Sequence, residues 1–239
     1  MALFDAQVRR IERFVAAARR AKKLIECPPP KKPWPKGDAL VLAEDTGCEL
    51  GNPAIGSVFA LVWSESLKIG KGRTWRIGPD IPELTGQSVP LCMFVLMRVS
   101  AAGHEYECYA RARDAIAETR LAGLMARMLP ARRNVWCRVS RAASKKGFSF
   151  GHWGGAILKR LAALDFVSGA DVLFVADNVK GLAELAEVSD EAGRVVGALC
   201  KMSEEMNLEC SGCEFAAVCD AVEDLRRIRS RLIEGRENG

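Results

Sequence analysis

The residues best suited to chemistry are four cysteines near the C-terminal end of the sequence. Cys200, Cys210, Cys213 and Cys219 are spaced C-x9-C-x2-C-x5-C. Thiolates bind soft metals and iron–sulfur clusters, and four is the common number of thiolates per cluster. Cys210 and Cys213 enclose Ser211 and Gly212, and the glycine lets the backbone fold tightly enough for both sulfurs to face one site. We predict that these four cysteines bind a [4Fe-4S] cluster.

Zinc is the alternative metal. Structural zinc sites usually combine one CxxC with a second CxxC or with histidines. This sequence has a single CxxC in the cluster of cysteines, and its two histidines, His104 and His152, lie far from it in the chain. A redox-active dithiol and four unrelated buried thiols are the remaining interpretations. Outside this segment, Cys92 and Cys137 lie in apolar stretches and are expected to be core residues.

The composition indicates an ordinary soluble protein. The chain has 239 residues, a net charge of +5 and 49% hydrophobic residues. Its apolar runs are too short to cross a bilayer as a helix, and charges occupy the N-terminal stretch where a signal peptide would be apolar. We therefore expect a cytoplasmic protein that does not bind membranes. The basic stretches "RRAKK" and "LRRIRSRL" lack an accompanying recognition motif, so nucleic acid is not an expected partner.

The N-terminal segment is expected to form a helical arm. Residues 4–26 have apolar side chains at helical spacing, namely Val8, Ile11, Val15, Ala18 and Ile25. The following "CPPPKKPWPKG" stops the helix, because proline lacks the amide hydrogen, and is expected to be a stiff extended linker. The apolar face would pack on the chain's own core, on a second copy in a homodimer, or on a partner protein.

The rest of the chain alternates strand-like and helical stretches, which indicates an α/β or α+β fold with a mixed sheet flanked by helices. Strands are expected at 39–45, 57–65, 73–81, 89–100, 134–140 and 170–177. Helices are expected at 105–128, 141–147, 153–165, 178–206 and 216–235. We divide the chain into an N-terminal helix and linker (1–37), an α/β domain (38–199) and a helical cysteine-rich segment (200–239).

Several other residues have both a structural and a functional interpretation, and the structural one is favoured for each. Asp80 belongs to a turn, and His152 stands beside a tryptophan in "FGHWGG". Gly154 and Gly155 are expected to open a helix, where exposed amides could bind phosphate or where small residues allow close packing. A set of arginines could contact a phosphate of a coenzyme A-like ligand: Arg111, Arg113, Arg120, Arg132, Arg133 and Arg138. No hydrolase or acid–base motif is present.

The region from Asp45 to Cys219 resembles the middle portion of the acetyl-CoA synthase subunit of the carbon monoxide dehydrogenase/acetyl-CoA synthase complex. The resemblance rests on the order and spacing of "ELGNPAIGSVFALVW", "RIGPDIPEL", "VPLCMFVLMRV", "VWCRVSRAASKKGFSFGHWGGAIL", "ADVLFVADNVKGLAEL" and "EVSDEA". In that family the "SDEA" segment leads into the cysteines of a [4Fe-4S] cluster. Here Cys200 follows Ala192 at nearly the family's distance, whereas the later cysteines depart from the family spacing.

The resemblance implies a stand-alone relative with the scaffold and the cluster but without the nickel site. The family binds nickel through Cys-Gly-Cys, and "CSGC" has one residue too many for that chelate. The family's link to coenzyme A involves arginines and a tryptophan, and Trp136 matches a different, strand-borne tryptophan. We expect a redox or accessory protein of anaerobic one-carbon and acetyl-CoA metabolism, with carbon monoxide dehydrogenase/acetyl-CoA synthase-type or ferredoxin-type partners. A small cluster-dependent enzyme and a coenzyme A or nucleotide binding module with a structural metal are the alternatives.

Overall fold

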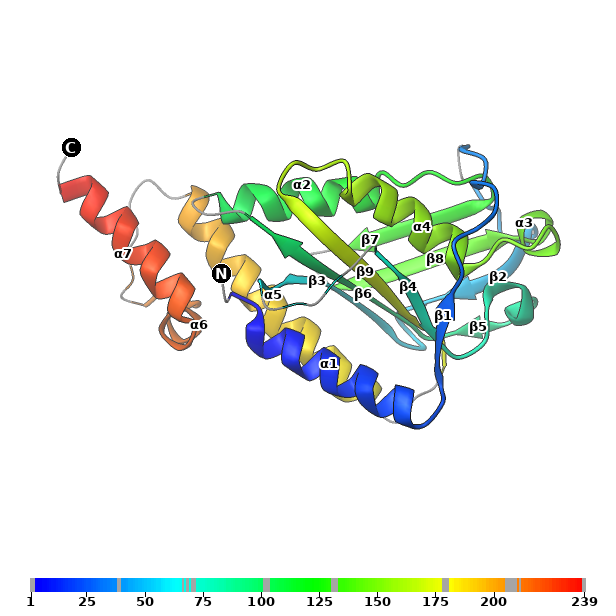
Figure 1. Ribbon diagram of the computed structural model, residues 1–239, viewed down its shortest axis with the longest axis horizontal. Helices are drawn as coiled ribbons and strands as arrows, with labels where there is room; N and C mark the ends of the chain where they lie inside the picture. Colours follow the sequence, from blue (N-terminus) through cyan, green and yellow to red (C-terminus); the bar gives the residue numbers. More distant parts are fainter. Residues whose placement is uncertain are drawn as a thin grey trace.

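The computed structural model describes residues 3–37, 40–65, 67, 69, 72–100, 104–129, 133–177, 181–204, 210 and 212–237. Within them, two mixed sheets are flanked by helices, as the sequence predicts (Figure 1). The larger sheet has the order β1–β4–β9–β6–β3, and the smaller sheet has the order β5–β2–β8–β7. The strands of the larger sheet are β1 (Leu24–Cys27), β4 (Thr74–Ile77), β9 (Val167–Val175), β6 (Leu91–Val99) and β3 (Ser57–Trp63). Those of the smaller sheet are β5 (Ser88–Val89), β2 (Thr46–Leu50), β8 (Asn134–Ser140) and β7 (Leu124–Leu129).

The apolar pattern of each strand matches its position. β6 lies inside the larger sheet, parallel to β3 and antiparallel to β9, and its first seven residues are all buried. A strand covered on both faces is expected to be a continuous apolar run, as "LCMFVLM" is. β8 instead alternates, with Val135, Cys137 and Val139 buried and their neighbours partly exposed, because only one of its faces meets the core. Cys92 and Cys137 are fully buried, as predicted.

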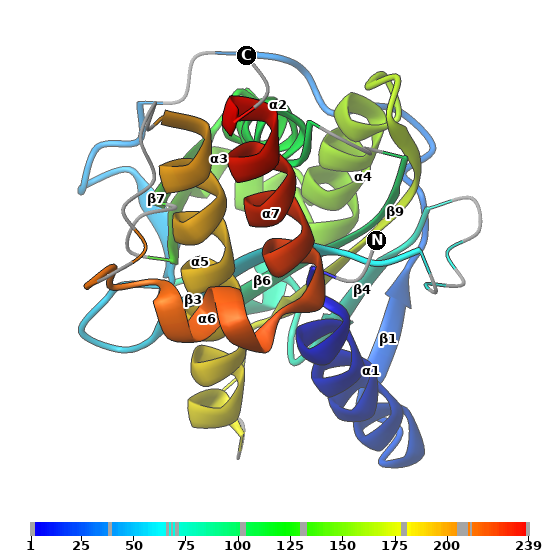
Figure 2. The ribbon, with the colours of Figure 1, turned by 90° about the vertical axis from the view of Figure 1, so that its left-hand side faces the viewer.

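The helices pack around the larger sheet (Figures 1 and 2). Helix α4 (Phe150–Leu161) packs on β4 and β9, and α2 (Glu105–Ala117) lies beside it. Helix α5 (Leu182–Glu204) packs on β3 and contacts both α1 (Asp5–Arg20) and α2. Helices α6 (Ala216–Ala221) and α7 (Glu223–Glu237) lie against the C-terminal part of the chain's long helix α5, as Figure 2 shows. The short α3 (Arg141–Lys145) and the 3-10 turn η1 (Ile81–Leu84) contact the smaller sheet.

The first helix is shorter than its apolar pattern predicts. It ends at Arg20 rather than at residue 26, and Lys22 adopts a left-handed φ of +57° that turns the chain. Residues Leu24–Cys27 then form β1, which pairs antiparallel with β4, so that Ile25 is 41% exposed on an edge strand. The prediction of Ile25 in the helical face was therefore wrong, because pairing with β4 outweighs the local helical preference.

Three other boundaries also differ from the prediction. The helix predicted at 105–128 ends at Ala117, and Gly123, with φ of +77°, leads into β7, which pairs with β8. The described residues 40–45 contain no strand, and β2 begins at Thr46 instead. The final helix predicted at 216–235 is broken at Val222, whose backbone is extended, into α6 and α7.

The N-terminal arm packs on its own chain in this structure. Phe4, Val8 and Ile11 are buried against α5 and β3, and Phe4 meets Trp63 edge to face with ring centroids 4.7 Å apart. The proline-rich stretch has no regular secondary structure, with bends at residues 31 and 32, and it is docked because Trp34 donates a hydrogen bond to the Ala122 carbonyl at 2.9 Å. The division into segments 1–37, 38–199 and 200–239 stays a prediction.

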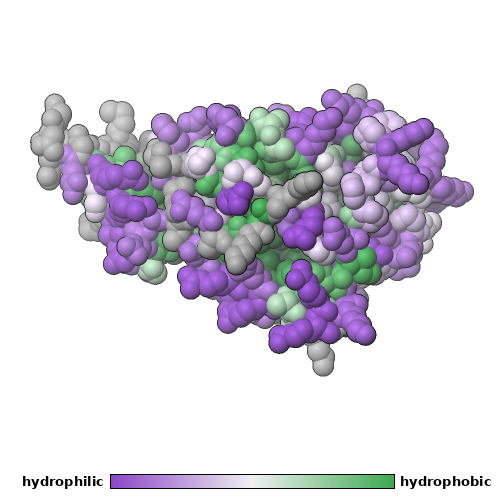
Figure 3. All heavy atoms as spheres, viewed as in Figure 1, coloured by the Kyte–Doolittle hydropathy of each residue, from purple (hydrophilic) through white to green (hydrophobic). Residues whose placement is uncertain are grey.

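The surface in the view of Figure 1 is hydrophilic at its rim, with apolar side chains visible in its middle (Figure 3). Within the described part of the chain, no helix combines the length and the apolar character needed to cross a membrane.

Candidate functional site

The predicted metal-binding cysteines lie at the end of α5 and in the turn and helix that follow. Cys200 is in the last turns of α5, half-buried, and its Sγ donates to the Tyr106 hydroxyl at 3.1 Å. Cys210 is exposed and Cys213 is half-buried, and the Cys213 amide donates to the Cys210 carbonyl at 3.4 Å. Gly212 between them has φ of +79°, which a side chain would strain. Cys219 is buried in α6.

The segment that carries Cys210, Cys213 and Cys219 packs on α5 where the helix has a glycine. Phe215 follows Cys213 by two positions, and its ring lies against Gly197, one turn before Cys200. A Cβ at Gly197 would stand only 2.7 Å from the Phe215 ring, so a side chain there would push the segment away. Burial raises the pKa of the Cys219 thiol, Arg229 lowers it, and the neighbouring Cys213 and Cys210 thiols raise it further. Both of these thiols therefore act electrostatically on Cys219.

The four cysteines have the ligand type and the number that a thiolate-bound metal needs. They are not arranged around one position in this structure. Among the residues that the structure describes, no three His, Cys, Asp or Glu side chains are placed to share one metal ion. A metal site rarely exists in an unfolded chain, so metal binding is coupled to the ordering of its ligands. The metal ligation of Cys200, Cys210, Cys213 and Cys219 therefore stays a prediction.

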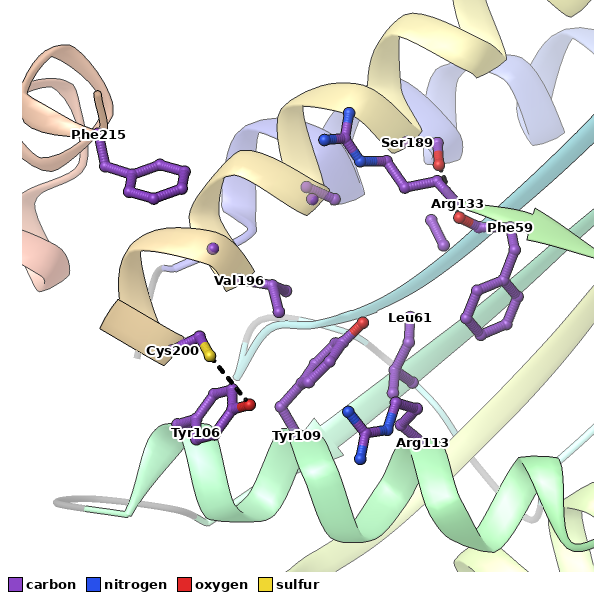
Figure 4. Close-up of a pocket in the computed structure, with 14 residues that line it drawn as sticks. Phe59, Leu61, Tyr106, Tyr109, Arg113, Arg133, Ser189, Val196, Cys200 and Phe215 are labelled. Atoms are coloured by element: carbon purple, nitrogen blue, oxygen red, sulfur yellow. Dashed lines mark hydrogen bonds between the residues drawn. The ribbon is translucent and has the colours of Figure 1, made fainter. Parts of the chain in front are cut away.

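Cys200 also lies at the edge of a pocket, which we call the α2–α5 pocket. It has a volume of about 330 Å³ and lies between α2, β3 and α5 (Figure 4). Its apolar wall includes Phe59 and Leu61 from β3 and Ala192 and Val196 from α5. Its polar groups include Tyr106, Tyr109, Arg113 and Arg133. Neither tyrosine could be singled out from the sequence, since a tyrosine on an amphipathic helix has no local signal that distinguishes a binding residue from a core residue.

The "SDEA" segment and the glycine after it build one wall of this pocket. Ser189 Oγ donates to the Phe59 carbonyl at 2.6 Å, which ties α5 to β3. Arg133 Nη1 donates to the Asp190 carbonyl at 3.0 Å and pairs with the Asp190 carboxylate. Arg133 lies across Gly193, where any Cβ would overlap its side chain. Glu191 faces the other way and accepts a hydrogen bond from Arg10 of α1 at 2.8 Å.

The remaining residues considered from the sequence have structural roles. The Asp80 carboxylate accepts hydrogen bonds from the Ile81 and Phe150 amides, at 2.8 and 2.9 Å, and so caps η1 and the start of α4. His152 Nδ1 lies 2.8 Å from Ser149 Oγ, and its ring packs edge to face on Trp34. Burial lowers the pKa of His152, and Asp80 raises it.

The prediction that Gly154 and Gly155 open a helix was wrong. Helix α4 begins at Phe150, so both glycines lie inside it. Gly154 lies within the helix, where a Cβ would overlap Thr74 of β4. Gly155 has more space, with Pro30 Cδ the nearest atom at 3.6 Å from a built Cβ. Close helix–strand packing therefore explains Gly154.

The five arginines of this set that the structure describes do not form one cluster. Arg111 pairs with Asp165 at 3.0 Å, and Arg138 pairs with Glu49 at 3.1 Å. Arg120 is exposed, and Arg132 lies outside the described residues. Of this set, only Arg113 and Arg133 line the α2–α5 pocket in the described part of the chain.

Comparison with known families agrees with the resemblance seen in the sequence. No curated protein matches this chain. One family model matches residues 37–180, which is more than half of the chain and includes β2 to β9 with α2, α3 and α4. That match ends before α5 and therefore before the four clustered cysteines. The chain belongs to the CdhC family, the CO dehydrogenase/acetyl-CoA synthase complex beta subunit family.

Proposed function

We propose that this chain is an iron–sulfur protein of the acetyl-CoA synthase family, in which Cys200, Cys210, Cys213 and Cys219 hold a [4Fe-4S] cluster. The observation that supports the proposal most is the docking of the CxxC turn on the last turns of α5 through Phe215 and Gly197. It brings the segment that carries three thiols beside the helix that carries the fourth. A cluster bound there supplies one-electron transfer.

The surrounding residues suit a negatively charged thiolate site. Arg229 of α7 pairs with Asp220 at 2.9 Å, and its positive charge also reaches Cys210 and Cys219. A nearby cation favours the thiolate form that binds metal. Phe215 and Val218 of this segment pack against the core, and limited solvent access is one of the factors that set a cluster's potential.

Family membership supports the physiological setting that we propose. The family's name places it in the CO dehydrogenase/acetyl-CoA synthase complex. We propose a redox or accessory role in that setting, in the cytoplasm of an anaerobic cell, with a subunit of such a complex or a ferredoxin as the electron-exchanging partner. We also propose that the chain has no nickel site of the Cys-Gly-Cys kind.

Metal analysis of anaerobically purified protein tests this proposal. We expect about four iron and four sulfide per chain, with a brown colour and an EPR signal after reduction. Cys210→Ser and Cys213→Ser should lose most of the iron, because each removes one thiolate from the set.

Cys108→Ala is the matched control, because Cys108 is a buried thiol of α2 outside the set and should leave the iron content unchanged. Stoichiometric zinc without sulfide would instead identify a structural zinc site. Iron that persists in both serine variants would show that these cysteines are not ligands.

A further inference from the structure

We propose that the α2–α5 pocket binds a small carboxylate with a short apolar chain, held at its charged end by the Tyr109 hydroxyl and Arg113. This site adjoins the proposed cluster at Cys200 but has its own ligand, and it goes beyond the cluster proposal.

Tyr109 has an unused donor that points into the pocket. The residue is only 7% exposed, yet its hydroxyl makes no hydrogen bond within the described part of the chain. The oxygen is not among the fully enclosed atoms without a partner, so it is open to the cavity. In Figure 4 it points from α2 toward Val196 and the β3 wall. A phenol this deeply buried normally has a hydrogen-bond partner, so a ligand that supplies an acceptor fits here.

The charges around Tyr109 favour one negative charge on the ligand. Burial raises the pKa of Tyr109 to about 12, although Arg113 and Arg133 both act to lower it, so the hydroxyl stays a donor at neutral pH. Arg113 already contacts Asp114 at 2.8 Å through Nε and Nη2, and Arg133 is paired with Asp190. Each guanidinium is thus partly neutralised but keeps further N–H donors. A monoanion suits this balance better than a polyphosphate.

The size and the walls of the pocket limit the rest of the ligand. A volume of about 330 Å³ is at the lower end of the range for ligand pockets. It accepts a short organic molecule and is too small for a whole nucleotide cofactor. Phe59, Leu61, Ala192 and Val196 form an apolar surface that would bury an alkyl chain. The chain would extend from Tyr109 along α5 toward Cys200 and Phe215 (Figure 4).

Ligand-observed NMR titration of the full chain with hexanoate, and with hexanamide as its uncharged match, tests the proposal. We expect hexanoate to bind the wild type about tenfold more tightly than hexanamide, because only the carboxylate pairs with Arg113. Tyr109→Phe keeps the ring and removes the hydroxyl, and Arg113→Gln removes the charge. Each should weaken hexanoate binding about tenfold, the effect of losing a hydrogen bond to a charged group.

Arg111→Gln is the matched control, because Arg111 is on the same helix but pairs with Asp165 outside the pocket, and it should bind hexanoate like the wild type. Equal binding of hexanoate and hexanamide by the wild type would overturn the proposal without the need for any variant. Unchanged hexanoate affinity in Tyr109→Phe would also overturn it. Tyr109 is not a proposed cluster ligand, so the iron content should be the same in the wild type and in Tyr109→Phe. Iron analysis therefore tests the cluster proposal independently of hexanoate binding.

Discussion

At the residue scale, Ser189 joins two elements that are far apart in the chain. It is 3% exposed and donates at 2.6 Å to the carbonyl of Phe59, a residue of the edge strand β3. We predict that Ser189→Ala lowers the free energy of unfolding by about 1–3 kcal/mol, because a buried carbonyl loses its partner. Urea unfolding followed by circular dichroism measures this.

Ser203→Ala is the control for that variant. Ser203 is on the same helix, is exposed, and its hydroxyl donates to the Cys200 carbonyl of its own helix. Its removal should change stability by no more than about 0.5 kcal/mol. Equal effects of the two substitutions would show that the link to Phe59 contributes nothing to stability.

At the element scale, the close packing of α4 on β4 depends on Gly154, which has no side chain. A Cβ at Gly154 would overlap the buried Thr74, whereas a Cβ at Gly155 meets only Pro30 at 3.6 Å. We predict that Gly154→Ala destabilises the protein by about 1–3 kcal/mol through overpacking, despite the better helix propensity of alanine. Gly155→Ala should stabilise it by up to about 1 kcal/mol for the same propensity reason.

The free energies of unfolding of the two variants, measured by thermal and urea unfolding, check this prediction. Both substitutions add one methyl group to the same helix, so a difference in sign isolates the contact with Thr74. Stabilisation by Gly154→Ala would mean that α4 does not lie as close to β4 as the structure places it.

At the scale of the whole molecule, α1 belongs to the core of its own chain. Ile11 is fully buried, and Arg10 joins α1 to α5 through Glu191 at 2.8 Å. We predict that Ile11→Ala lowers the free energy of unfolding by about 2–5 kcal/mol, because it leaves a cavity. Unfolding midpoints should not depend on protein concentration, as expected for a monomer whose helix stays in place.

Glu12→Ala is the control, because this neighbour of Ile11 is exposed and should change stability by less than about 0.5 kcal/mol. A midpoint that rises with protein concentration would indicate that α1 exchanges between two copies of the chain. Light scattering would then give the mass of a dimer.

The sequence by itself determined the elements that depend on local pattern. The apolar runs of β3, β6 and β9 and the helical period of α5 predicted buried strands and a long helix, and the order of these segments carried the resemblance to the family. Thiol chemistry is visible in the residue types alone, so the spacing of the four cysteines predicts a metal site, and that site stays a prediction. The fold class and the family could be predicted since neither requires knowing which distant residues touch.

Only the tertiary structure decided where local preference was ambiguous. Residues 124–129 fit a helix as well as a strand, and they form β7 because the register with β8 gives their backbone groups partners. Residues 24–27 became β1 for the same reason. The α2–α5 pocket was also invisible in the sequence, since Tyr109, Arg133 and Val196 come from three separate segments. They meet because α2 and α5 pack together and Gly193 leaves room for Arg133, and no local pattern encodes that approach.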